Sequence, residues 1–180
     1  QAFVRIHRVI NTPIASETAP APAGSATFKT ERERSEAALK EADTFLANFG
    51  SSRLRDEVQL VRARLLVGLG RAPEAVTLYN GLVGEVDDSL KFVADEGLAY
   101  AQEAAGQVDA AIATLDKLAE KSKGAGNFFR DRALYNKARL LEGKGAKKDA
   151  EALYRSILTE VPTTSLKEDI NHRLAILENK

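Results

Sequence analysis

The stretch Ala138–Ile157, ARLLEGKGAKKDAEALYRSI, carries a spacing of small and large residues that occurs twice more, earlier in the chain. An alanine lies seven positions before a glycine, and a second alanine lies five positions after that glycine. A large apolar or aromatic residue follows four positions later, and another three positions after that. The three copies are Ala63, Gly70, Ala75, Tyr79 and Leu82, then Ala99, Gly106, Ala111, Leu115 and Leu118, then Ala138, Gly145, Ala150, Tyr154 and Ile157. The spacing predicts two helices that meet at the glycine and approach closely at the alanines.

A helix pair of this size cannot bury its apolar face alone, so copies must stack on one another. The three glycines lie 36 and 39 residues apart, which defines a repeating unit. We expect a half repeat at residues 31–49, full repeats at 54–86, 89–121 and 128–161, and a final helix at 165–178 that covers the end of the stack. The predicted fold class is therefore all-α, built from antiparallel helix pairs with a C-terminal capping helix.

These motif residues resemble the tetratricopeptide repeat (TPR) family, whose period is about 34 residues. The resemblance covers about residues 31–180 and is most specific in the third copy, which also has Pro162 at the family position. No copy has the tryptophan typical of the first helix, and the first copy lacks the terminal proline. The resemblance implies a TPR-like right-handed α-solenoid, with a TPR domain over residues 29–180.

The first 28 residues have a different composition. Residues 2–10, AFVRIHRVI, place Phe3, Ile6 and Ile10 on one face of a short amphipathic helix, and Ala, Pro, Ser and Thr dominate the text from about residue 13 to 25. We interpret residues 1–28 as a membrane-proximal segment followed by a flexible linker, and the alternative is a tail that packs loosely on the domain or is disordered. Because the chain opens at Gln1 and contains no Met, we expect a missing N-terminal piece, which could be a tag, a signal peptide or a membrane anchor.

Composition argues against several kinds of chemistry. Lys+Arg and Asp+Glu both number 26, which argues against nonspecific nucleic-acid binding. The absence of Cys excludes disulfides and thiolate chemistry. His172 has Glu168 and Asp169 one turn before it, a set that we interpret as a solvated helix face rather than a metal site. The turn at residues 143–145, Gly-Lys-Gly, lacks the frame of a phosphate loop. We therefore expect no enzyme activity, no catalytic residue, no cofactor and no metal.

Two longer stretches suggest a branch of the TPR superfamily. LAYAQEAAGQVDAAI (98–112) and YRSILTEVPTTSLKEDINHRLAIL (154–177), together with the half repeat and the linker, resemble bacterial envelope TPR proteins, most of all the YfgM-like ancillary subunits of the Sec translocon. This resemblance implies a periplasmic scaffold, anchored in the inner membrane, that assists translocation or envelope assembly with translocon or chaperone partners. The alternatives are a soluble cytoplasmic TPR adaptor, a self-associating structural protein, and an accessory domain of an enzyme.

The resemblance also implies a binding surface, because first helices line the concave face of TPR proteins. Carried over by their spacing from the repeat glycines, the predicted protein-binding residues are Glu57, Leu60, Arg64, Tyr100, Glu103, Arg132, Tyr135 and Arg139. Leu60 and Arg64 replace residues that TPR co-chaperones use to grip a terminal carboxylate, so we do not expect that function. The alternative is that some of these residues only pair internally, such as Arg139 with Glu142.

Charge is unevenly distributed between the second and third repeats. Acidic residues crowd residues 85–120, and basic residues crowd 121–148. This separation could steer a bipolar partner or promote head-to-tail self-association. The alternative is that the opposite charges form contacts between adjacent repeats.

Overall fold

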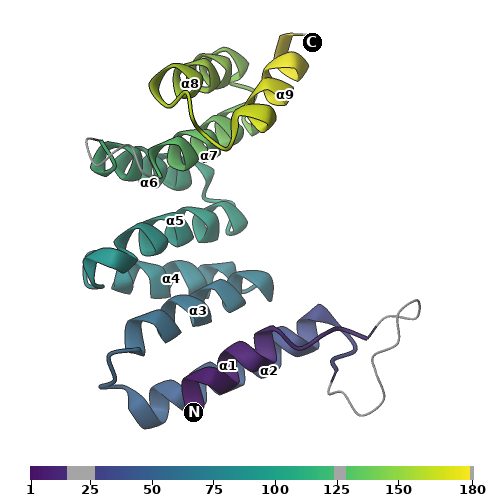
Figure 1. Cartoon of the computed structure of the whole chain (residues 1–180), viewed down its shortest axis with the longest axis vertical. Helices are drawn as coiled ribbons and strands as arrows, with labels where there is room; N and C mark the ends of the chain where they lie inside the picture. The colour runs from purple at the N-terminus through teal and green to yellow at the C-terminus, as the bar shows by residue number, and fades with distance from the viewer. Residues whose placement is uncertain (16–26, 124–128, 179–180) are drawn as a thin grey trace. The chain divides into compact units, whose positions relative to one another are not determined.

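The computed structural model describes residues 1–15, 27–123 and 129–178 (Figure 1), and every regular element in these ranges is a helix. The helices are α1 (Ala2–Ile10), α2 (Glu31–Phe49), α3 (Arg55–Gly68), α4 (Ala72–Leu82), α5 (Asp88–Ala104), α6 (Val108–Lys121), α7 (Arg130–Gly143), α8 (Lys147–Glu160) and α9 (Lys167–Glu178). The predicted all-α class is confirmed. The chain divides into two compact units, Gln1–Gly97 and Leu98–Lys180, and α5 contributes to both. Within each unit, helices that follow one another in sequence pack together.

The three repeat glycines form the same turn in each copy. Gly70, Gly106 and Gly145 have φ values of 77°, 75° and 82°, in the left-handed region that glycine adopts without a steric penalty. In each turn the residue after the glycine donates its N–H to the carbonyl five residues earlier, over 2.8 to 3.0 Å. This is the Schellman arrangement, which satisfies the last carbonyls of a helix while the chain reverses. The turn chemistry therefore explains why glycine stands at this point of the repeat.

The small and large residues of the repeat form the core. All six repeat alanines are at most 3% exposed, and the large residues that follow the second alanine are at most 4% exposed. In the third copy, Tyr154 and Ile157 are fully buried. The alanines let the helix axes approach, and the larger side chains fill the space behind them. The periodicity thus identified the buried face of each repeat correctly.

Two helix boundaries differ from the predicted ones for local reasons. Helix α4 ends at Leu82 rather than residue 86, because Val83 has extended backbone and Gly84 has a φ of 89°. Helix α7 begins at Arg130, because Phe129 before it has a left-handed φ of 68°. Residues 124–128 of the predicted inter-repeat loop lie outside the described residues.

Helix α1 packs on α2, so residues 31–49 have a partner helix and do not form a lone half repeat. Ile6 is fully buried in a cluster with Ala42, Phe45 and Val58. The apolar face predicted for residues 2–10 is therefore covered by unit 1 itself, and the boundary expected at residue 29 falls inside that unit. A helix of nine residues is only marginally stable alone in water. Burying its apolar face in unit 1 stabilises it through the hydrophobic effect.

The chain on either side of the predicted linker is joined by hydrogen bonds. The Ala15 N–H donates to the Phe28 carbonyl over 2.8 Å, and the Phe28 N–H donates to the Pro13 carbonyl over 3.2 Å. Arg34 on α2 donates to the Thr12 carbonyl over 3.3 Å. These bonds fix both ends of the connection near the start of α2. The linker residues 16–26 themselves lie outside the described residues.

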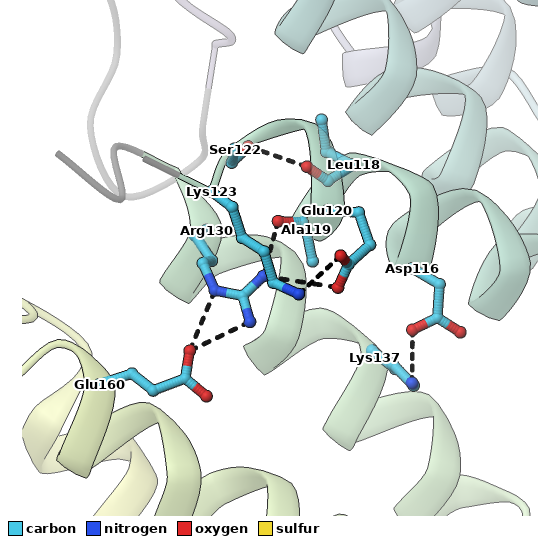
Figure 2. A network of polar contacts seen from close by, with 9 residues as sticks. All are labelled: Asp116, Leu118, Ala119, Glu120, Ser122, Lys123, Arg130, Lys137 and Glu160. Atoms are coloured by element: carbon cyan, nitrogen blue, oxygen red, sulfur yellow. Dashed lines mark hydrogen bonds and ion pairs between the residues drawn. The ribbon is translucent and has the colours of Figure 1, made fainter. Parts of the chain in front are cut away.

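A buried arginine at the start of α7 connects the ends of two other helices (Figure 2). Arg130 is 7% exposed, and its Nε and Nη2 atoms each lie 3.0 Å from Oε2 of Glu160 at the end of α8. Its Nη1 donates over 2.6 Å to the Ala119 carbonyl near the end of α6. Because the last turn of a helix carries partial negative charge, the guanidinium is well placed between these two termini. Arg130 therefore fixes the position of α7 between α6 and α8.

Candidate protein-interaction surface

Five of the predicted binding residues lie in unit 2, on α5 and α7. Tyr100 on α5 is 42% exposed, which is unusual for a large aromatic side chain. On α7, Arg132 is exposed and Tyr135 is half-buried, with its ring centroid 5.7 Å from that of Tyr154. The contact with Tyr154 restricts the Tyr135 ring. We call Tyr100, Arg132 and Tyr135, with the paired Glu103 and Arg139, the tyrosine face.

Glu103 and Arg139 pair with each other rather than standing free. Nη1 and Nη2 of Arg139 each lie 2.6 Å from a different carboxylate oxygen of Glu103, so the pair is bidentate and joins α7 to α5. The hydrogen bond from Arg139 lowers the pKa of Glu103 below its usual value, and the same bond raises the pKa of Arg139. The predicted internal pairing of Arg139 is therefore real, but its partner is Glu103 in the preceding repeat and not Glu142.

Glu142 instead joins α7 to the final helix. Arg173 on α9 donates to both carboxylate oxygens of Glu142 over 3.4 Å, and the Tyr154 hydroxyl donates to one of them over 3.4 Å. Arg173 also has a side-chain hydrogen bond with Tyr135. The predicted capping helix is thus connected to the tyrosine face. Sequence reasoning missed Arg173, because its partner stands 31 positions earlier.

Inside unit 2, acidic residues of the second repeat form ion pairs with basic residues of the third repeat. Besides Glu103 and Arg139, Asp116 pairs with Lys137 over 2.5 Å, and Asp109 pairs with Lys144. Each pair joins an acidic residue of the second repeat to a basic residue of the third. This confirms the interpretation that the opposite charges form contacts between adjacent repeats. Steering of a partner and self-association stay predictions.

The three predicted residues of unit 1 are in different environments. Leu60 is 6% exposed and belongs to the core, so its side chain does not line a surface that a partner could reach. Glu57 is half-buried. Arg64 is exposed and lines a pocket of about 330 Å³ together with Ile10 and Gly68. Arg64 therefore lies at a hollow of the surface.

A glycine that sequence reasoning overlooked determines the packing of α4 on α5. A Cβ atom at Gly97 would lie 2.4 Å from the ring of Tyr79, a distance that real Cβ contacts do not show. Tyr79 is buried, and this burial raises its pKa to about 12. The signal in the sequence is a glycine in the middle of a predicted helix, which often marks close packing.

Residues 1–15, 27–123 and 129–178 are the part of the chain that the structure describes. In these ranges no group of three or more His, Cys, Asp or Glu side chains is placed to hold a metal ion. No helix there combines the length and the apolar character needed to cross a membrane.

Comparison with known proteins places the fold. A family model described as tetratricopeptide repeat matches residues 97–163. The chain is similar to a crystal structure of nearly identical TPR-like repeats from a Podosopora anserina kinesin light chain, with a TM-score of 0.68 and 20% identity over 83% of this chain and 79% of that one. A search of curated proteins found no match. The chain therefore has a TPR-like fold, and its residues 97–163 match the tetratricopeptide repeat model. Repeats of this family generally form non-catalytic protein-interaction scaffolds. Neither match distinguishes the YfgM-like branch from other TPR proteins.

Proposed function

We propose that this chain is a non-catalytic scaffold that binds a protein or peptide partner on the tyrosine face of unit 2. The observation that carries this proposal is the exposure of Tyr100 and Arg132 on the two helices that also hold the restrained Tyr135. Tyr100 and Tyr135 both lie close enough to Arg139 to contribute to the rise of its pKa. Tyrosine and arginine dominate the energetics of many interfaces. A tyrosine also offers a large contact area with few rotatable bonds, so it loses little entropy on binding.

The pairing of charges on this face restricts the kind of partner. Glu103 neutralises Arg139, and Arg173 lies beside Glu142, so two of the cations near the tyrosines already have acidic partners. The partner would therefore be held by apolar and aromatic contacts and by hydrogen bonds to the two hydroxyl groups. We expect such binding to depend only weakly on ionic strength, because long-range attraction between net charges contributes little to it.

We further propose that the scaffold works in the bacterial periplasm, anchored in the inner membrane by a segment preceding Gln1, and that its partners are translocon or chaperone components. The support is the resemblance of residues 98–112 and 154–177 to envelope TPR proteins. Because α1 packs on α2, an anchor joined to Gln1 would connect directly to unit 1 rather than through residues 16–26. A soluble cytoplasmic adaptor and a self-associating structural protein are the alternatives that the test must separate.

The test is a crosslinking pull-down from envelope membranes with the protein expressed from its full gene. The variant is Tyr100→Ala with Tyr135→Ala, and the control is Phe49→Ala, because Phe49 in unit 1 is 49% exposed and thus matches Tyr100 in exposure and size. We expect translocon or chaperone components with the wild type and the control, and their loss with the double variant. Equal recovery with all three proteins would refute the tyrosine face as the site. Absence of the wild type from membranes would refute the envelope assignment.

A further inference from the structure

The final helix contributes a side chain beside the tyrosine face. Arg173 on α9 hydrogen-bonds to Tyr135 on α7. From Nη1 it also donates to both carboxylate oxygens of Glu142, each over 3.4 Å. The Arg173 side chain is 36% exposed, so it lies at the surface of unit 2. The helix that was predicted only to cap the stack is therefore in contact with a residue to which the proposed function assigns partner binding.

The hydroxyl group of Tyr135 accepts a hydrogen bond but donates none within the described residues. Arginine has no acceptor atom, so the Tyr135 oxygen is the acceptor in its bond with Arg173. A tyrosine hydroxyl also has one proton to donate. No residue in the described ranges forms a hydrogen bond with that proton. The proton is therefore available to a partner, since the Tyr135 side chain is only half-buried.

The neighbouring tyrosine, in contrast, uses its proton inside the fold. Tyr154 is fully buried, and its hydroxyl donates to Oε2 of Glu142 over 3.4 Å. Its ring centroid lies 5.7 Å from that of Tyr135, so the two rings restrict each other. Of these two adjacent hydroxyl groups, the one on Tyr135 is thus left for binding.

Arg173 fixes the direction of this donor and raises its strength. Because the guanidinium occupies a lone pair of the Tyr135 oxygen on the α9 side, the O–H bond is directed away from α9. Hydrogen bonds in a chain polarise one another, so an O–H whose oxygen accepts from a cation is a stronger donor. The Tyr135 hydroxyl is therefore oriented before any partner binds.

The charges around this hydroxyl group favour an uncharged acceptor. Arg139 and Arg173 both interact electrostatically with Tyr135, and each has a carboxylate partner. Those partners are Glu103 and Glu142, respectively. A carboxylate of the partner would gain little net attraction here and would lie near two existing carboxylates. A backbone carbonyl has no such cost, and carbonyls without an internal partner occur in extended segments rather than within helices.

We propose that Arg173 positions the Tyr135 hydroxyl to donate to a backbone carbonyl of an extended segment of the partner. Arg173 acts through Tyr135 and is thus a positioning residue, so α9 is part of the binding site as well as the cap of the stack. The inference rests on the proposed function, because Tyr135 belongs to the tyrosine face.

The test uses the full chain and a defined peptide probe. Short peptides are selected from a random library for binding to the wild type, and those whose binding is lost in Tyr100→Ala are kept. Their affinity is measured by fluorescence anisotropy. We expect Arg173→Ala and Tyr135→Phe each to weaken binding about two- to tenfold, the effect of one hydrogen bond. The double variant should bind no more weakly than Tyr135→Phe alone, because Arg173 acts through that hydroxyl.

Arg155→Ala is the matched control. Arg155 on α8 lies 2.5 Å from Glu178 on α9, so this variant also removes an ion pair that holds the capping helix. The partners of Arg155 are Glu151 and Glu178, and neither belongs to the tyrosine face. We expect Arg155→Ala to bind the peptides as the wild type does.

The acceptor on the peptide is identified by replacing its backbone amides, one at a time, with esters, whose carbonyls are weaker acceptors. One replacement should weaken binding to the wild type but not to Tyr135→Phe. If binding instead depends on an Asp or Glu side chain of the peptide through Tyr135, the acceptor is a carboxylate and the proposal is wrong.

The outcomes separate this inference from the proposed function. If no peptide depends on Tyr100, the proposed function fails and the inference fails with it. Where such peptides exist, unchanged binding to Arg173→Ala would overturn the inference alone. Equal weakening by Arg155→Ala, or additive losses in the double variant, would also overturn it, since Arg173 would then only hold α9 in place.

Discussion

Replacing the buried arginine of α7 should destabilise unit 2 strongly. In Arg130→Ala, the Ala119 carbonyl loses the guanidinium that bonds to it over 2.6 Å, and Glu160 loses both of its 3.0 Å contacts. An unsatisfied buried acceptor costs about 1–3 kcal/mol, and a hydrogen bond to a charged group contributes about 1.5–3 kcal/mol. Glu160 is 41% exposed and regains water, so we count its loss at the lower end. The expected total is about 2.5–4.5 kcal/mol.

Urea unfolding followed by circular dichroism measures this loss of free energy of unfolding. In thermal unfolding, the melting temperature should fall by about 5–18 °C. The control is Arg155→Ala, since Arg155 also contacts two carboxylates, Glu151 and Glu178, but is 55% exposed. Because exposed ion pairs contribute little, this control should lose less than about 1 kcal/mol. If the two variants lose the same stability, Arg130 does not hold α6, α7 and α8 together as argued.

Three further predictions concern the turn, the first helix and a buried phenol. Gly106→Ala should cost about 1–2 kcal/mol in urea unfolding, because its φ of 75° is strained for an L-residue, whereas Gly81→Ala, with open space around its Cβ, should cost nothing. Ile6→Asp should release α1 from α2 and expose it to limited trypsin digestion, since Ile6 is fully buried; continued protection of α1 would refute its packing. Burial raises the pKa of Tyr79 to about 12, so the unfolded chain ionises first and stability should fall between about pH 10 and 12. In Tyr79→Phe, the loss of unfolding free energy over this pH range should be smaller by up to about 2–3 kcal/mol. A pH profile of stability identical to that of the wild type would contradict the raised pKa of Tyr79.

The repeat could be predicted from sequence because its determinants are local. A glycine at each turn and alanines at fixed distances on either side specify a left-handed residue and a close helix contact, and both are present in all three copies. The predicted core residues of the repeat followed from the same spacing. The helix ends were less accurate where a single backbone dihedral, as at Phe129, terminates the element.

The candidate site was harder to predict because it depends on pairs that are distant in sequence. Arg139 has an acidic residue three positions later, and nothing in the sequence shows that Glu103, 36 positions earlier, is its partner. Leu60 was placed on the binding surface by analogy, but the core of unit 1 buries it.

The most direct test of the account is site-specific photo-crosslinking in cells that express the full gene. A photoreactive amino acid replaces Tyr100 in one protein and Phe49, with its similar exposure, in another. The account predicts that position 100 crosslinks to a distinct protein partner and that position 49 does not. Crosslinking from position 49 alone, or from position 100 only to a second copy of the chain, would contradict the claim that the tyrosine face binds a partner protein.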